Sequence, residues 1–372
     1  MSEELLSVRG TAASVQQESD ESGTLHVYVA FDWGEQIRLD EAARQVPASR
    51  QELPRRRRTP TSFTYRPPPL HLALEPVALE LPELGAVTAA AGLRLFDFGA
   101  VSLALRIPFT LPASALVRLA GALAEPSSLV QTARLVLQPL FEQLLPAIDD
   151  PCWQSDLSEE YFVFQLSPCN RDVAKDAAWL AGLVHLESAP LSASETAEAL
   201  RLHLSYSPDD AFIADWGAAV LVDRDCEETL QAIEFANLQL LELRHIDNRL
   251  DDSLAEAARA IEPWTRSRLP FWRIQGRPLR VLGELKVEAY ALFERTGNAL
   301  KLVGDPYLAR VYRLVAARFH LETWEVNIQR KLEVAESVYQ VVSDQASHCR
   351  AEFLELIVVL LIVIEIVLAF VR

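Results

Sequence analysis

One histidine and three aspartates lie close together in the sequence and are the first candidates for chemistry. They are His245, Asp247, Asp251 and Asp252. Imidazole and carboxylate groups bind divalent metals or transfer protons when they converge on one point. The spacing places these aspartates on neighbouring turns of one helix, interleaved with Arg244 and Arg249. We therefore interpret the segment as an exposed, charged helix face.

Two glutamates one helical turn apart form a second candidate. Glu284 and Glu288 could act as an acid and a base, but Lys286 between them suits surface salt bridges equally well. The sequence contains no nucleophile elbow, HExxH helix, Walker loop or GxGxxG turn, and its four cysteines lack metal-ligand spacing. We predict no catalytic, cofactor-binding or metal-binding residues.

A motif of aspartate, an aromatic residue and glycine occurs three times, at residues 32–34, 97–99 and 215–217. The second and third copies run on into apolar strand patterns. Glycine permits the tight turn or bulge that other residues resist, so we read two α/β units that a duplication could relate. If this region is an enzyme, Asp97 and Asp215 at the strand ends are its candidate site residues.

The end of the sequence is strongly apolar. From residue 353 to 371, every residue is Phe, Leu, Ile or Val except Glu355, Glu365 and Ala369. A helix of this length reaches about 28 Å, close to the roughly 30 Å hydrocarbon core of a bilayer, so we predict one C-terminal transmembrane helix. The alternative is a buried core strand or helix, which seldom reaches this length.

The two glutamates of this segment receive different predictions. Glu365 lies deep in the predicted span, where an ionisable side chain usually faces a partner or water. It is expected either to be protonated or hydrogen-bonded across a helix pair, which would hold a homo-oligomer together, or to reach water at the far headgroups. Glu355 lies about 15 Å earlier along the helix, which places it at the membrane interface.

The composition and the N-terminal residues limit which classes of partner and which location the sequence predicts. The 372 residues carry a formal net charge of −17, whereas direct nucleic-acid binding needs clustered Lys and Arg. The first residues lack the apolar segment of a secretory signal. The predicted location is the cytoplasmic (inner) membrane, with a single-pass tail anchor and the bulk of the chain in the cytoplasm.

The predicted fold class is α+β, in four parts. Residues 1–24 form a polar, disordered tail, and 25–200 form an N-terminal α/β region with short sheets and a basic, proline-rich loop at 42–69. That loop could contact lipid headgroups, although a solvated connection is favoured. Residues 201–345 add a further α/β unit and long helices, and 353–371 form the span.

A helix start is predicted at Gly304, Asp305 and Pro306, where glycine ends one helix, aspartate caps the next and proline fits its first turn. Apolar residues then recur at steps of three and four between 321 and 342. This stripe predicts packing on a partner helix, either in an intramolecular hairpin or in a coiled-coil dimer.

Several short motifs of the C-terminal part occur together in one known family. They are Leu241-Glu242-Leu243-Arg244, Gly283-Glu284-Leu285, Gly304-Asp305-Pro306-Tyr307 and the Leu354-Glu355 to Ile364-Glu365 pattern. With these motifs, about residues 200–372 resemble the YagE-like family, which is of unknown function and includes proteins required for meiotic nuclear division.

The resemblance implies a membrane-associated protein with a terminal helix and no established catalytic residue or cofactor. The mitochondrial relative is linked to organellar translation as an inner-membrane anchoring factor. Together with the apolar end, the resemblance predicts a membrane-tethered, noncatalytic scaffold or adaptor, with the lipid bilayer and unidentified proteins as partners. The alternative is an enzyme that acts on a membrane-proximal or nucleotide-like substrate through the α/β region.

Overall fold

A computed structural model describes residues 20–46, 67–125, 128–153, 157–167, 175–223, 226–266, 286–287, 289–291, 293–294 and 306–371. The strands are β1 (Asp20–Asp32), β2 (Gln36–Ile37), β3 (Leu70–Ala73), β4 (Val77–Leu81), β5 (Gly85–Leu95), β6 (Ala100–Pro112), β7 (Ile148–Asp149), β8 (Glu159–Leu166), β9 (His203–Leu204), β10 (Ala211–Ala214) and β11 (Ala218–Val222). The helices are α1 (Leu39–Gln45), α2 (Ala113–Leu123), α3 (Ser128–Leu144), the 3-10 helix η2 (Leu145–Ala147), α4 (Ala177–His185), α5 (Ala193–Ala199), α6 (Glu227–Arg266), α8 (Pro306–Arg318) and α9 (Leu321–Val371).

Within the described residues, one 9-stranded sheet runs in the order β3-β5-β6-β1-β8-β11-β10-β9, with β4 paired to β5 beside this path. Neighbouring strands are antiparallel except β8 and β11, which are parallel. The structure mixes helices with a many-stranded sheet, and the predicted short sheets are therefore wrong. The strands of residues 25–200 and those of residues 201–345 form one sheet because β8 pairs with β1 on one side and with β11 on the other.

The strand β1 lies at the centre of this sheet, between β6 and β8. Its side chains alternate between the two faces, as the pleat of a strand requires. Val27, Val29 and Phe31 enter the core on one face, whereas Tyr28 and Ala30 enter smaller cores on the other. Because both faces are covered, this part of the sequence is continuously apolar and not alternating.

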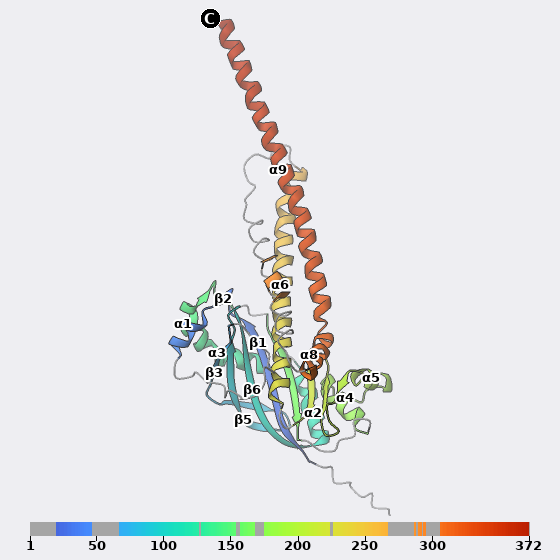
Figure 1. The fold of residues 1–372 in the computed structure, drawn as a ribbon. Helices are drawn as coiled ribbons and strands as arrows, with labels where there is room; N and C mark the ends of the chain where they lie inside the picture. The colour runs from blue at the N-terminus through green and yellow to red at the C-terminus, as the bar shows by residue number, and fades with distance from the viewer. Residues whose placement is uncertain are drawn as a thin grey trace, which may run out of the picture.

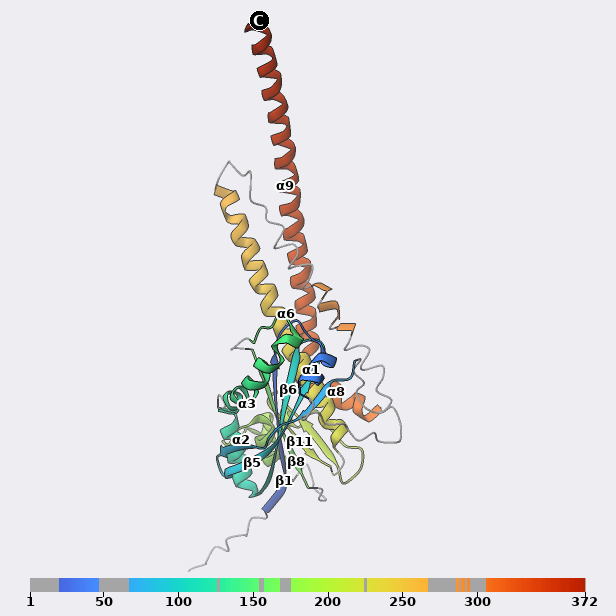
Figure 2. The ribbon, with the colours of Figure 1, turned by 90° about the vertical axis from the view of Figure 1, so that its left-hand side faces the viewer.

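Helices cover both faces of the sheet, and the fold has three layers (Figures 1 and 2). Buried residues of α2, α3 and α4 share the core that contains Val27. On the opposite face α6 packs against β1, β6 and β8, whereas α8 packs against α6 and the strands β9 and β10, and α9 packs on α6. The helix α6 thus lies between the sheet and α9, with α8 beside it.

The first half of α6 is buried on nearly all sides, from residue 229 to 243. A buried polar group is costly unless it has a partner, and two of the buried polar residues here have partners in the neighbouring layers. Glu234 forms an ion pair with Arg94 of β5. Gln239 donates from Nε2 to Glu325 Oε1 of α9 at 3.0 Å. These contacts fix the position of α6 against both neighbouring layers.

The second half of α6 leaves the sheet in contact with α9 near Lys331 and then diverges from it, and the 51-residue α9 continues well past the end of α6 (Figures 1 and 2). Ile328 and Leu332 of the predicted apolar stripe are buried in the core around α6. Lys331 Nζ lies 2.7 Å from the Oδ1 atoms of both Asp247 and Asp251, which ties the two helices together. The described part of the stripe therefore packs on α6 of the same chain.

The predicted transmembrane helix at residues 353–371 is wrong. In the portion of the chain that the structure describes, none of the helices combines the length and the apolar character that crossing a membrane requires. The apolar residues are not a separate helix but the end of α9, which begins at Leu321 and carries charges such as Glu322 and Lys331 in its first half. The predicted tail anchor and the location in the cytoplasmic membrane depended on this span and are corrected with it.

The first two copies of the repeated motif meet at one corner of the sheet. Trp33 N donates to Gly99 O at 3.1 Å, and Ile37 N donates to Asp97 O at 3.0 Å. Gly99 has a φ of +94°, and a Cβ at this position would lie only 1.7 Å from Gly34 O. This close approach explains the glycine of the second copy. In the first copy, a Cβ at Gly34 would lie 2.8 Å from Asp149 O and 2.9 Å from Asp150 O, so each glycine is required by its own neighbours.

Replacing Gly99 by alanine should destabilise the protein strongly. The added Cβ would collide with backbone and would also require a strained φ, so we expect a loss of about 3 kcal/mol or more in the free energy of unfolding. Gly92→Ala is the control, because a Cβ at Gly92 meets nothing closer than Leu72 O at 3.8 Å. Urea unfolding of both variants measures the difference, and equal losses would contradict the proposed clash.

Candidate functional site

The third copy of the motif forms the turn between β10 and β11. Asp215 N donates to Ala218 O at 2.9 Å, which closes the turn. Tyr161 Oη donates to Asp215 O, also at 2.9 Å, from inside the core. Burial raises the pKa of Tyr161, so its hydroxyl keeps its proton and remains a donor. Both bonds hold the Asp215 backbone and thereby set the direction of its carboxylate.

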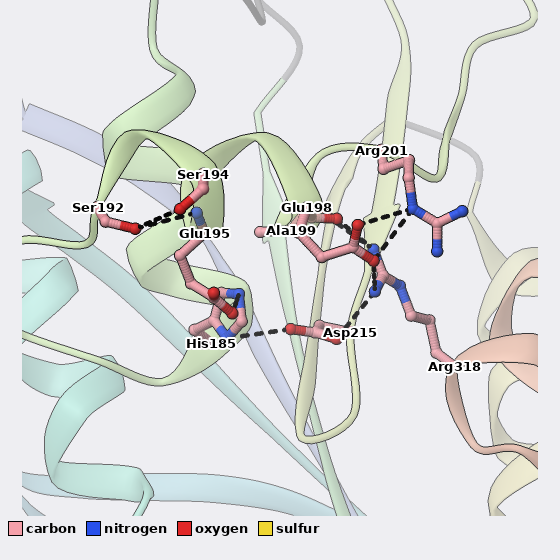
Figure 3. A network of polar contacts seen from close by, with 9 residues as sticks. All are labelled: His185, Ser192, Ser194, Glu195, Glu198, Ala199, Arg201, Asp215 and Arg318. Atoms are coloured by element: carbon pink, nitrogen blue, oxygen red, sulfur yellow. Dashed lines mark hydrogen bonds and ion pairs between the residues drawn. The ribbon is translucent and has the colours of Figure 1, made fainter.

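The Asp215 carboxylate lies between basic groups from two helices (Figure 3). Its Oδ2 is 3.2 Å from His185 Nδ1, at the end of α4, and its Oδ1 is 3.5 Å from Arg318 Nη1, at the end of α8. The side chains of Asp215 and Arg318 are only 12% and 11% exposed. In such a poorly hydrated place, each charge depends on the other for compensation.

Arg318 also closes the end of α5. Its Nη2 donates to Glu198 O at 2.8 Å and to Ala199 O at 3.2 Å, which are carbonyls of the last turn of that helix. The last carbonyls of a helix have no partner within it, and a cation there also opposes the partial negative charge of the helix end. Arg318 therefore connects α8 both to α5 and to the β10–β11 turn.

Asp32, in the first copy of the motif, makes a matching contact at the end of β1. Its Oδ2 is 2.8 Å from His245 Nδ1 on α6, and its Oδ1 accepts a hydrogen bond from Gly34 N at 3.0 Å. Beside this pair, Arg244 forms an ion pair with Glu159 of β8. Burial raises the pKa of Glu159 to about 7, against the opposing effect of Arg244.

An aspartate that orients a histidine is a common arrangement for general base catalysis. Here, however, the polar contacts of both histidines within the described residues go to carboxylates alone, with Glu195 Oε1 lying 3.8 Å from His185 Nε2. Nor does any group of three or more His, Cys, Asp or Glu residues, among those described, have an arrangement that could hold a metal ion. The geometry suits anchoring of helices to the sheet.

The four residues of the predicted charged helix face, 245, 247, 251 and 252, lie on different sides of α6. His245 faces the sheet, whereas Asp247 and Asp251 bind Lys331 of α9, and Asp252 is exposed. These four residues therefore do not converge on one point.

Several other predicted residues lie outside the described part of the structure. They are Glu284, Glu288, Gly304 and Asp305. Helix α8 begins at Pro306, and Lys286 Nζ lies 2.8 Å from Glu336 Oε2 of α9. Glu355 and Glu365 belong to α9, but their side chains are outside the description.

Sequence reasoning marked Asp215 through its motif but missed its partners. His185 and Arg318 are common residue types at helix ends, and nothing in one sequence links them to a turn so distant along the chain. Glu159 was missed for a similar reason, because its burial depends on the packing of α6. Only the tertiary structure brings these groups together.

Comparison with known proteins gives a family match for residues 22–228, to the family described as "Uncharacterized protein MJ0711, N-terminal domain". The chain is 27% identical over 177 residues to Uncharacterized protein MJ0711 of Methanocaldococcus jannaschii. These aligned residues make up 46% of this chain and 52% of the relative. The chain thus spans about half the length of the curated relative it matches. No solved structure matches.

These findings correct the resemblance to the YagE-like family. The motifs that suggested it are three or four residues long and lie mainly after residue 228, whereas the match found extends through the sheet domain. The membrane-tethered scaffold predicted from that resemblance is also wrong, because the relative is described only as uncharacterized and, across the described residues, no helix could span a membrane.

Replacing Arg318 should weaken the attachment of α8 to the sheet domain. Arg318→Met leaves the buried Asp215 with one basic neighbour and the end of α5 uncapped, so we expect a loss of about 2 to 4 kcal/mol in the free energy of unfolding. Arg313→Met is the control, because Arg313 is exposed on the same helix and bonds only Ala309 O of that helix. Chemical denaturation compares the two, and similar losses would argue against an anchoring role.

Proposed function

We propose that this chain, which belongs to the MJ0711 N-terminal domain family, is an assembly protein whose copies associate through the end of α9. The sheet domain would hold the base of the α6–α9 stalk, and the stalk would present the associating segment. The observation that carries this proposal is a set of exposed aliphatic side chains around that segment.

The aliphatic residues near the end of α9 are about half exposed. They are Val358, Val359, Leu361, Ile362, Val363, Ile364 and Ile366, at 46–59% exposure. Each residue of a helix is turned by about 100° from the one before, so these side chains point in all directions around the axis. A helix that is apolar all round is normally buried, and a large exposed apolar surface indicates an interaction site.

The free energy available from covering this segment supports the proposal. Burying the exposed half of a valine or isoleucine side chain gains roughly 1 kcal/mol. Several such residues per copy, in an oligomer where each segment has more than one neighbour, can exceed the cost of association of about 4 to 15 kcal/mol. Association of several helices is therefore favoured over a single shallow contact.

A second copy of the same chain is the partner that best fits the segment. Between residues 357 and 366 the sequence holds aliphatic residues and Glu365 only, so it offers no charge pattern that would select a different protein. Figures 1 and 2 place this end of α9 far from the sheet, so the ends of several copies can meet without collision of their sheet domains. Closed symmetry brings such identical surfaces together.

Glu365 acquires a role within the same proposal. A glutamate among aliphatic helices must be protonated or hydrogen-bonded, because an isolated charge in apolar surroundings is costly. One such polar residue per helix can fix the register and the number of helices in a bundle. We expect Glu365 of neighbouring copies to pair in this way.

The test is the mass in solution of the purified full chain, measured by analytical ultracentrifugation. We expect an oligomer for the natural chain, and for Ile362→Lys a dissociation constant at least about tenfold higher, because a charge would enter the apolar interface. Val334→Lys is the matched control: Val334 is 48% exposed and Ile362 is 50% exposed on the same helix. The control should remain oligomeric.

A parallel flotation with phospholipid vesicles distinguishes other uses of the segment. The proposal requires that the oligomer stay free of vesicles. A monomeric natural chain, or a chain that floats with vesicles and does not self-associate, would overturn it.

A further inference from the structure

The outer face of α8 is basic, whereas its other side packs against α6 and the strands β9 and β10. The exposed residues lie at steps of four and three along the helix, which places them on one side of it. They are Pro306, Arg310, Arg313 and Ala317, followed by His320 just after the helix. Residues 306–320 contain three arginines, one histidine and no Asp or Glu, although the chain as a whole carries a net charge of −17. The charge of this surface is therefore opposite to that of the molecule.

Exposed aromatic rings lie at both ends of this face. At its start, Tyr206 of the β9–β10 loop is 77% exposed, and its ring centroid lies 5.7 Å from that of Tyr307. At its end, Trp216 of the β10–β11 turn is 50% exposed, and its ring centroid lies 6.3 Å from that of His320. Tyr, Trp and Arg are the residue types most enriched where binding energy concentrates in protein interfaces. The basic face thus joins two groups of this kind.

Trp216 is held in place by the residues beneath it. Phe319 is 1% exposed, and its ring centroid lies 6.0 Å from that of Trp216 and 5.0 Å from that of Tyr161 in the core. The neighbouring Asp215 lies 3.5 Å from Arg318 of α8, so the turn and the helix are attached to each other (Figure 3). Trp216 therefore loses little conformational freedom when a partner covers it, which lowers the entropic cost of binding.

The two arginines of this face are positioned but not neutralised. Arg310 Cζ lies 5.6 Å from the centroid of the Tyr307 ring, and Arg313 Nε donates to Ala309 O at 3.0 Å. Neither arginine has a carboxylate partner among the described residues. Both guanidinium groups therefore keep N–H donors for an external carboxylate, which arginine binds with two parallel hydrogen bonds.

The acidic residues near α8 already have contacts within the fold. Glu198 Oε1 and Asp215 Oδ1 each lie 3.5 Å from Arg318 Nη1. Asp210 Oδ1 accepts a hydrogen bond from Tyr206 N at 2.8 Å. Because these carboxylates serve the helix ends and the β9–β10 loop, the basic charge of the outer face remains available to a partner.

We propose that the outer face of α8 is a docking site for an acidic peptide segment of a partner protein. Two carboxylates of the segment bind Arg310 and Arg313, and an apolar residue at either end packs on the exposed rings. Positions 307 and 320 are about 20 Å apart along a helix, which six or seven residues of extended chain can span. The site lies at the base of the stalk and does not require association of copies through α9.

Two other classes of anionic partner fit this surface less well. A nucleic acid would find only two arginines without carboxylate partners, and the net charge of −17 repels a long polyanion. A membrane surface is bound by helices whose apolar side faces the lipid, whereas the apolar side of α8 is buried, including Leu308 and Val311. A short peptide with two carboxylates matches both the pair of arginines and the flanking rings.

Fluorescence anisotropy of labelled seven-residue peptides with the full chain tests the proposal. Each peptide has Leu or Phe at both ends, two glutamates at inner positions in every combination, and serine elsewhere; a matched set has glutamine in place of glutamate. We expect at least one glutamate peptide to bind about tenfold or more tightly than its glutamine counterpart. Arg313→Met should weaken that binding about tenfold, because charge-assisted hydrogen bonds are lost.

Two further variants separate docking from general charge attraction. Arg330→Met removes the same charge from an exposed arginine of α9, whose Nη1 donates to Asn327 Oδ1 at 3.4 Å, and should leave the affinity unchanged. Trp216→Ala changes no charge and should weaken the binding about tenfold, because an apolar contact is lost.

Three results would contradict the proposal. One is that no glutamate peptide binds more tightly than its glutamine counterpart. Another is an equal loss of affinity in Arg313→Met and Arg330→Met. The third is that polyuridylate or phosphatidylserine vesicles bind more tightly than every peptide and lose this binding in Arg313→Met, which would assign the face to a nucleic acid or to a membrane.

Discussion

The burial of α6 between two layers is the constraint on which the arrangement of the other elements depends. Nearly all sides of its first half are covered, so its buried polar side chains need partners in a neighbouring layer. Glu234 forms an ion pair with Arg94 of β5, and Gln239 donates a hydrogen bond to Glu325 of α9. These requirements fix the distance of α9 from the sheet and leave α8 a defined position beside both.

The repeated motif supplies attachment points for the helices. Asp32 contacts α6 and Asp215 contacts α8, while the copy at residues 97–99 supports Asp32 and its neighbours through backbone contacts. The family match ends at residue 228, so both anchoring aspartates belong to the matched domain, and almost the whole of the helical region that they hold lies beyond it. A common turn sequence thus serves to join two parts of one chain.

Local patterns in the sequence allowed prediction of an apolar strand after the third copy of the motif and of long helices in the C-terminal part. The single sheet was not predictable, because the pairing of β8 with both β1 and β11 is decided by contacts distant in the sequence. The apolar end of α9 was judged from its own length and composition, although it continues a charged helix. The partners of Asp215 carried no local signal, because tertiary packing brings them together.

The central place of β1 has a consequence for the order in which the chain can fold. β1 comes first among the described strands, yet its two neighbours are β6 and β8, which follow much later. While the chain is being synthesised, both edges of an apolar strand stay unpaired until those residues have emerged, and open edges of this kind are prone to wrong pairing. The same topology that buries β1 most completely in the finished protein leaves it exposed for longest beforehand.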